Sequence, residues 1–338
     1  MGKSGSMFMA GVLTGLLGAC LLGALAIRPK ESAAGAAGQI VLKLGHGLDA
    51  QHPVHKAMLL MKERLEELTG GRATLDVYSG GVLGNETKCL EQVQRGELAM
   101  TKVSTAALEG FIPDMMVFGI PFVFRDEAHC WATLHGPVGE RMLELGVKNH
   151  FQGLCYYDSG DRNFYSTKKP IRSAADVAGM KIRVMTSRTA IDMISAMKGS
   201  ACPISWGELY TALDQGTVDA AENNWPSFVT SRHFEVCKYF TLSGHQRIPD
   251  MVIISTKAWD KLPGDIQKAL REAARESEAF QRELWREETE RCLAFAKEQG
   301  VEVITPDLEG FRAACAPILQ KKEYAGIKAL YNAIQEVK

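Results

Sequence analysis

The sequence predicts an α/β protein with two lobes, in which two α/β domains surround a cleft and one long helix lies across both. A β-loop-α-β pattern over residues 39–78 opens the first domain, and a second α/β pattern occupies residues 179–228. The chain crosses between the domains near Asp161 and near Pro249, so the two lobes can close on a ligand. Residues 263–299 contain no internal proline and predict the long helix.

The composition limits the class of protein. The 338 residues include 39 Lys and Arg against 40 Asp and Glu, so the formal net charge is −1. This length fits one large domain or two medium domains. Because the sequence has no basic excess and no long run of charge, we expect no nucleic acid among the partners.

The first 38 residues differ from the rest and predict an export signal followed by a flexible leader. Lys3 precedes an apolar run over residues 7–27, and residues 24–26 match the small-x-small pattern of a cleavage site. Two alternatives remain open. The run is just long enough to stay as an uncleaved membrane anchor, and Cys20 lies in a sequence similar to a lipoprotein cleavage box. Residues 32–38 are rich in Ala and Gly and form the leader.

Eight cysteines occur in the chain, and none forms a CxxC pair or a zinc-binding spacing. Removal of the signal would leave an odd number, which allows one disulfide but does not indicate a disulfide framework. We expect most of these side chains to be buried small apolar groups. The cysteines are Cys20, Cys89, Cys130, Cys155, Cys202, Cys237, Cys292 and Cys315.

The predicted boundaries assign residues 39–160 plus 250–285 to domain I and residues 161–249 plus 286–338 to domain II. The expected strands cover residues 39–44, 73–78, 97–104, 153–157, 163–166, 181–185, 217–221, 249–255 and 301–304. The expected helices cover residues 53–69, 87–95, 126–148 with a break at 136–137, 174–179, 206–216, 263–299, 308–316 and 323–337. Residues 111–124 are expected to form a packed loop, and the alternative for the long helix is two helices with a kink.

Polar residues gather where two predicted strands of the second domain end. Arg183 lies in one strand, and a Glu-Asn-Asn-Trp cluster at residues 222–225 follows the other. Ligands of α/β units collect at the carboxyl ends of strands, and a guanidinium fork with two amides and an aromatic face suits a small polar anion. The alternative is that Arg183 pairs with Asp219 or Glu222 while the amides cap a turn.

A second arginine, Arg162, is placed at the start of a strand in the same lobe as Arg183. Two arginines facing one cleft favour a carboxylate ligand. Because an unpaired buried arginine is costly, the site would reject ligands that lack the acid. The alternative for Arg162 is an ion pair with a local acid such as Asp161.

The sequence indicates neither a metal site nor catalysis. The three histidines between residues 46 and 55 lack the i, i+4 spacing of metalloprotease ligands, and we expect no metal. No nucleophile elbow, phosphate-binding loop or dinucleotide fingerprint occurs, so we expect no cofactor and no enzyme. Glu86 and Glu222 are the one pair of carboxylates that would suit the acid and the base of an enzyme. His46 is expected to face the cleft.

The chain resembles a known family, the extracytoplasmic solute-binding proteins of TRAP transporters (tripartite ATP-independent periplasmic transporters) of the DctP type. The resemblance covers nearly all of the chain after Gln39. Its strongest markers are Gly-Met-Lys-Ile-Arg at residues 179–183 and the run at residues 208–223. Leu83-Gly84 and residues 90–96 add support in the first lobe.

The resemblance implies the two-lobed periplasmic binding protein fold. It also implies a monomeric receptor that captures an organic acid in the periplasm and passes it to the small and large membrane subunits, driven by a sodium gradient. The carboxylate-binding arginine of the family falls on Arg183, a second arginine on Arg162, and the cleft asparagine on Asn223.

Three segments, residues 45–56, 160–165 and 222–228, are similar to a branch of the family that binds hexuronates such as glucuronate and galacturonate. The alternatives within the same receptor class are sialic acid and a C4-dicarboxylate. A sugar acid would use arginines for the carboxylate, amides and Glu86 for the hydroxyls, and an aromatic face for the ring. The expected ligand-binding residues are Arg183, Arg162, Asn223, Asn224, Glu86, His46, Lys102, Tyr165, Trp225 and His245.

Overall fold

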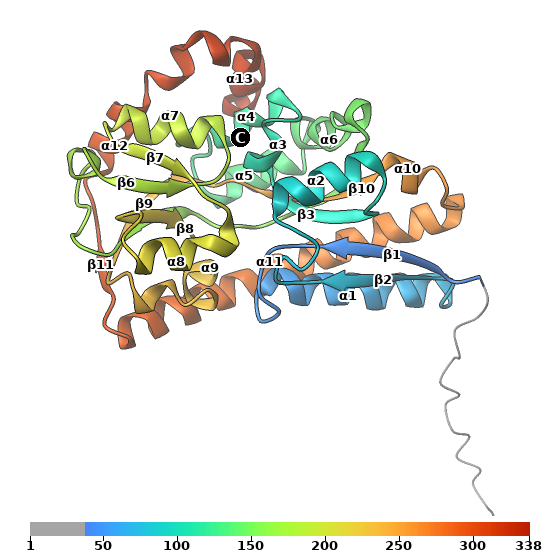
Figure 1. Ribbon diagram of the computed structural model, residues 1–338. Helices are drawn as coiled ribbons and strands as arrows, with labels where there is room; N and C mark the ends of the chain where they lie inside the picture. Colours follow the sequence, from blue (N-terminus) through green and yellow to red (C-terminus); the bar gives the residue numbers. More distant parts are fainter. Residues whose placement is uncertain (1–37) are drawn as a thin grey trace, which may run out of the picture. The chain divides into compact units, whose positions relative to one another are not determined.

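The computed structural model describes residues 38–338, which form one compact unit (Figure 1). The predicted export signal therefore lies outside the described residues. Within residues 38–338, no helix is both long enough and apolar enough to cross a membrane. The cysteines of this part of the chain are all free, and all except the half-buried Cys202 are buried.

The first sheet has five strands in the order β2-β1-β3-β10-β4. β1 runs parallel to β2 and β3, whereas β10 runs antiparallel to β3 and β4. The strand expected after Pro249 is β10, and its place here confirms that the chain returns to the first sheet. The bounds are β1 Ile40–Gly45, β2 Ala73–Tyr78, β3 Met100–Ser104, β4 Phe151–Tyr157 and β10 Asp250–Ser255.

Helices connect the strands of the first sheet. α1 begins at a proline, and Gly70 ends it with a φ of 58°, a conformation that glycine adopts without strain. Residues 111–124 are not a plain loop, because Pro113 starts a 3₁₀ turn that continues into α4. The bounds are α1 Pro53–Thr69, α2 Glu86–Arg95, α3 Thr105–Leu108, α4 Met116–Gly119, α5 Glu127–Leu134, α6 Pro137–Glu144 and α10 Thr256–Trp259.

The second sheet has six strands in the order β11-β9-β5-β8-β6-β7. β6 runs parallel to β7 and β8, and β5 runs antiparallel to β8 and β9. Their bounds are β5 Arg162–Ser166, β6 Lys181–Val184, β7 Ser200–Pro203, β8 Ala220–Asn223, β9 Tyr239–Gln246 and β11 Glu302–Ile304.

The strand expected over residues 217–221 is shifted in the structure. Gly216 has a φ of 68°, and pairing of β8 begins only at Ala220, so Glu222 and Asn223 lie inside the strand. The helix expected over residues 206–216 is a 3₁₀ turn followed by the shorter α8. Helices α7 and α9 and strands β7 and β9 were not predicted. The remaining helices are α7 Arg188–Ala196, α8 Leu209–Asp214, α9 Trp225–Thr230, α12 Leu308–Cys315 and α13 Lys328–Glu336.

The single long helix is confirmed as α11, Gly264–Glu298, with 35 residues. Its first half contributes Ile266 and Leu270 to the core beneath the first sheet, together with α1. Its second half contributes Cys292 and Ala296 to the core beneath the second sheet and contacts α9. Figure 1 shows α11 running beneath both halves of residues 38–338. The assignment of the remaining segments to two domains stays a prediction.

Candidate functional site

A cavity lies between the two sheets. From the first half it is lined by the loop after β1, the start of α2, the end of β3 and the start of β10. From the second half it is lined by residues at one end of β5, β6 and β8. Trp285 of α11 closes it from the side of the long helix. Six of the ten predicted site residues line this cavity: Arg183, Arg162, Asn223, Asn224, Glu86 and Lys102.

Arg183 is a buried cation without a carboxylate partner. The residue is only 3% exposed, and its Nε donates to the backbone oxygen of Ile204 at 2.8 Å. Its Nη1 has no hydrogen-bond partner, and within residues 38–338 no carboxylate lies within ion-pair distance of it. Burial lowers the pKa of Arg183, because the charged form has lost its hydration. The predicted pair with Asp219 or Glu222 does not form.

Arg162 is paired, but its partner is Glu222 and not Asp161. Nε donates to Glu222 Oε2 at 2.5 Å, and Nη2 donates to Oε1 at 3.0 Å and to the backbone oxygen at 2.9 Å. Nη1 donates to Asn223 Oδ1 at 3.1 Å. Of the five N–H groups of this guanidinium, one on Nη1 remains for a ligand.

Glu222 holds its charge in spite of complete burial. Burial alone would raise the pKa of this carboxyl. The charge of Arg162 and the hydrogen bonds that the Glu222 carboxylate accepts bring the pKa down to about 2. The Arg162–Glu222 pair is thus ionised and neutral overall. Arg183 is therefore the cation of this pair of arginines that is left without compensation.

The two asparagines serve different purposes. Asn224 caps α9, since its Oδ1 accepts from Ser227 N at 2.9 Å, as the turn-capping alternative expects. Asn223 Oδ1 accepts from Arg162 Nη1, from Asn224 N at 2.9 Å and from Asn224 Nδ2 at 3.0 Å. With its oxygen fully engaged, Asn223 offers the two N–H donors of its amide to the cavity.

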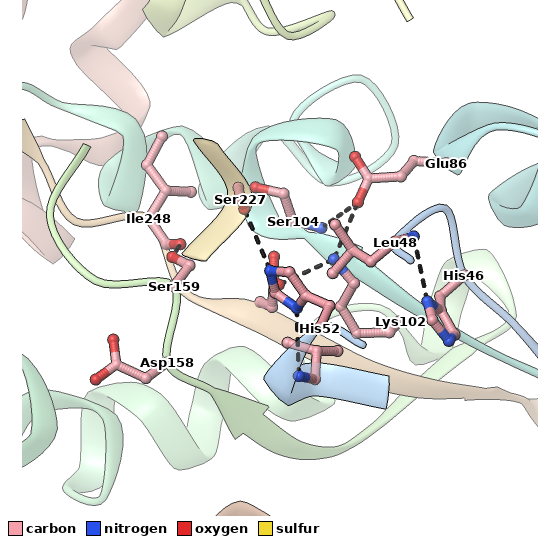
Figure 2. Close-up of polar contacts among 12 residues, drawn as sticks. His46, Leu48, His52, Glu86, Lys102, Ser104, Asp158, Ser159, Ser227 and Ile248 are labelled. Atoms are coloured by element: carbon pink, nitrogen blue, oxygen red, sulfur yellow. Dashed lines mark hydrogen bonds and ion pairs between the residues drawn. The ribbon is translucent and has the colours of Figure 1, made fainter. Parts of the chain in front are cut away.

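A charged cluster on the side of the cavity formed by the first sheet contains Asp250, which was not predicted as a site residue. Lys102 Nζ lies 2.9 Å from Asp250 Oδ2 and 3.5 Å from Glu86 Oε1 (Figure 2 shows Lys102 and Glu86). Glu86 Oε1 also accepts from Ser104 N at 3.0 Å. Burial raises the pKa of Asp250, although the charge of Lys102 acts to lower it. Burial opposes the charge of Lys102, yet the two carboxylates raise its pKa.

His52 also lines the cavity and was not predicted as a site residue. Its Nδ1 accepts from Val54 N at 3.3 Å at the start of α1, so its Nε2 carries the proton and donates to Ser227 Oγ at 3.3 Å (Figure 2). The ring centroid lies 5.6 Å from that of Trp285. His52 thus joins the first half to α9 of the second half.

His46, predicted to face the cleft, does not line the cavity. Its Nε2 lies 2.9 Å from His55 Nδ1, and its Nδ1 accepts from Leu48 N at 3.2 Å (Figure 2). Burial, Lys102 and His55 together lower the pKa of His46 to about 3. The neutral ring therefore holds the loop that borders the cavity.

Tyr165, Trp225 and His245 do not line the cavity either, because each ring is held in the core. Tyr165 donates or accepts at His233 Nδ1 at 3.0 Å, Trp225 stacks on Phe240 at 3.5 Å, and His245 lies 2.8 Å from Ser243 Oγ. The aromatic faces of the cavity come instead from Trp206 and Trp285. The guanidinium carbon of Arg183 lies 5.6 Å from the Trp206 ring centroid.

Comparison with known proteins decides the family. Residues 44–325 match the family model DctP, the bacterial extracellular solute-binding protein, family 7. The chain belongs to this family. The match confirms the TRAP solute-binding resemblance, and the solved family structures confirm the mixed α/β fold with its long helix.

Three proteins illustrate what this family 7 member is similar to. A TRAP periplasmic solute-binding protein of Bradyrhizobium, solved with galacturonate, is 35% identical with a TM-score of 0.84, covering 88% of this chain and 98% of that one. A Pseudomonas putida F1 protein solved with D-glucuronate is 35% identical with a TM-score of 0.86 and the same coverage. The 2,3-diketo-L-gulonate-binding periplasmic protein YiaO of Escherichia coli K12 is 30% identical over 78% of this chain and 80% of its own.

The family 7 cavity combines four kinds of ligand contact. Arg183 presents an uncompensated guanidinium, and Asn223 presents amide donors. Glu86 presents a carboxylate, and two tryptophans supply apolar faces. A cation, amide donors, carboxylate acceptors and aromatic rings suit a small acid that carries hydroxyl groups.

Proposed function

We propose that this receptor captures a hexuronate, such as glucuronate or galacturonate, and delivers it to the small and large membrane subunits of a TRAP transporter. The observation that carries the proposal is Arg183, a buried guanidinium in the cavity without a carboxylate partner among residues 38–338. A ligand carboxylate would supply the missing charge and two hydrogen-bond acceptors in one group. The hexuronates bound by the solved relatives give independent support.

The other end of a sugar acid also fits the cavity. Hydroxyl groups both donate and accept, so they can meet the amide of Asn223 and the carboxylate of Glu86 together. The apolar face of a pyranose ring would lie against Trp206 or Trp285. Sialic acid and a C4-dicarboxylate remain the alternatives within the receptor class, and a dicarboxylate would need a second uncompensated cation.

An exported hydrolase or lyase has less support. The pair for acid-base chemistry would be Glu86 and Glu222, but Glu222 is fully buried and bonded to Arg162 with a pKa near 2. A carboxylate held this way is a poor base at neutral pH. Recovery of intact galacturonate after long incubation with the protein would support binding without turnover, whereas conversion of the sugar would contradict it.

The test of the proposed ligand is a thermal-shift screen of the exported part of the chain. A ligand that binds only the folded state adds about 2.7 kcal/mol at a concentration 100 times its Kd. We expect glucuronate or galacturonate to raise the melting temperature and succinate and sialic acid to leave it unchanged. A shift with succinate alone would keep the receptor and overturn the hexuronate ligand.

The proposal also covers where the receptor works. It places the protein in the periplasm as a monomer, free after cleavage of the export signal or tethered by an uncleaved one. The periplasmic relatives support this location. Size-exclusion chromatography with light scattering measures the oligomeric state, and sequencing of the mature N-terminus decides between the free and the tethered form.

A further inference from the structure

The charged side chains that line the cavity fall into two groups. In the first group Arg183 is uncompensated, because the neighbouring Arg162 is neutralised by Glu222. In the second group Lys102 faces two carboxylates, Asp250 at 2.9 Å and Glu86 at 3.5 Å. One positive and two negative charges leave this group with a net charge of −1. Arg183 belongs to the second sheet, whereas Lys102 and Asp250 belong to the first, so the second-sheet side of the cavity is its cationic end and the first-sheet side its anionic end.

The anionic end has hydrogen-bond acceptors to spare. Lys102 and Ser104 N occupy Oε1 of Glu86, and Lys102 occupies Oδ2 of Asp250. Within residues 38–338, Oε2 of Glu86 and Oδ1 of Asp250 accept no hydrogen bond. Both carboxylates line the cavity. Free carboxylate oxygens need donors, and a ligand hydroxyl is a donor whereas an ionised ligand carboxylate is not.

We propose that Glu86 and Asp250 set the charge of the ligand, so that the cavity takes monoanionic sugar acids and rejects the corresponding diacids, the aldarates. This inference rests on the proposed function, because it assumes that the ligand carboxylate binds Arg183. The opposite end of a uronate then offers hydroxyl donors to Glu86 and Asp250. An aldarate would place a second carboxylate against two like charges, and Lys102 is already bonded to both of them.

The experiment compares galacturonate with galactarate by calorimetry. Galactarate carries a second carboxylate at the carbon that is the anomeric carbon of galacturonate. Like charges brought together in a binding site cost several kcal/mol, so we expect galactarate to bind at least about 100-fold more weakly than galacturonate. The variant Glu86→Gln keeps the size of the side chain and removes one charge. We expect it to narrow the ratio of the two affinities by about 10-fold.

Two controls separate charge from ring closure and from misfolding. Galactarate cannot close a ring, so a preference due to the ring alone would leave the ratio unchanged in Glu86→Gln and would overturn the proposal. Asp250→Asn tests the same charge at the second carboxylate if Glu86→Gln does not fold. Glu63→Gln, at an exposed position of α1, removes one charge elsewhere and should leave the ratio as it is.

The outcomes distinguish this inference from the proposed function. Binding of galacturonate with equal binding of galactarate would overturn the charge selection and leave the hexuronate receptor intact. Binding of neither galacturonate nor glucuronate would overturn the proposed function itself. A wide ratio in the unaltered protein that narrows in both charge variants would support the role of Glu86 and Asp250.

Discussion

Arg162 and Arg183 lie two strands apart in the second sheet, on β5 and β6, yet their charges have different fates. Arg162 is satisfied by Glu222 and Asn223 in the absence of any ligand. Arg183 is held by one backbone oxygen and by the ring of Trp206. Under the proposed function the cost of burying Arg183 without a counterion is recovered when the ligand carboxylate binds, so a ligand that lacks the acid should bind far more weakly.

The variant Arg183→Lys tests this role. Lysine keeps the positive charge but lacks the planar fork that can bond both oxygens of a carboxylate. Loss of one charged hydrogen bond predicts galacturonate affinity lower by about 100-fold, measured by calorimetry. Arg188→Lys is the matched control, because Arg188 is half-exposed and pairs with Asp192 away from the cavity. Unchanged affinity in Arg183→Lys would contradict the assigned role.

Sequence patterns could place Arg183 and Asn223 on the cavity, because both lie near the ends of parallel strands. They could not place Asp250, which reaches the cavity only because β10 returns antiparallel to β3 and sets Asp250 opposite Ser104. They could not place Trp206 either, since its position beside Arg183 depends on the unpredicted strand β7. Contacts set by distant strand pairing leave no local signal.

Among the elements, α1 begins in an unusual way. Its cap is the imidazole of His52, whose Nδ1 accepts from Val54 N, where serine, threonine, aspartate or asparagine is the usual residue. The other ring nitrogen contacts Ser227 of α9. One side chain thus caps the N-terminus of a helix in the first half and contacts a helix of the second.

A pair of substitutions at His52 separates the cap from the contact with α9. His52→Ala removes both, whereas His52→Asn supplies a good cap but is too short to replace the ring against Trp285. We expect the free energy of unfolding of His52→Ala to be about 1 kcal/mol lower than that of His52→Asn in urea titrations. Equal stability of the two variants would show that a capping side chain at position 52 adds nothing measurable to the stability of α1.

The elements predicted best from the sequence were those whose ends are marked by proline or glycine. α11 was predicted at full length because no proline or internal glycine interrupts residues 265–298. The strand before Glu222 was placed too early, because the apolar residues Val218 and Ala220 gave no sign that pairing starts only at Ala220. Helix α7 was missed although Ser187 caps it, since its apolar residues follow the strand without a glycine or proline between them.

Across residues 38–338, the two sheets are held together by α11 and by contacts on either side of the cavity. Asn85 Nδ2 lies 3.2 Å from Ser205 Oγ, and His52 Nε2 lies 3.3 Å from Ser227 Oγ. These bonds join neutral groups, so their net contribution to stability is modest, about 1 kcal/mol each. Buried contacts away from the cavity add to these bonds: the carboxylate of Glu109 accepts from Ser187 Oγ at 3.0 Å, and one apolar core cluster contains both Phe118 of the first half and Met193 of the second.

Buried neutral histidines on both sides of the cavity make the stability of the folded state dependent on pH. Burial lowers the pKa of His46 to about 3, with Lys102 and His55 adding to the effect, and burial with the charge of Arg183 lowers the pKa of His233 to about 3. In the unfolded chain the same groups titrate near 6.5. The unfolded state therefore binds protons first, and stability falls as the pH falls below 6.5.

The expected loss is on the order of 2 kcal/mol for each of these histidines at about pH 5, full stability being kept above the unfolded pKa. Urea unfolding curves at neutral pH and at about pH 5 measure it. The variant His233→Gln lacks the contribution of His233 to this pH dependence, so its unfolding free energy should depend less steeply on pH. Below about pH 4.5 protonation of Glu222, whose folded pKa is about 2, should steepen the loss further. Unfolding free energies that do not change between neutral pH and about pH 5 would mean that both histidines accept protons in the folded state, and that the core around them admits water.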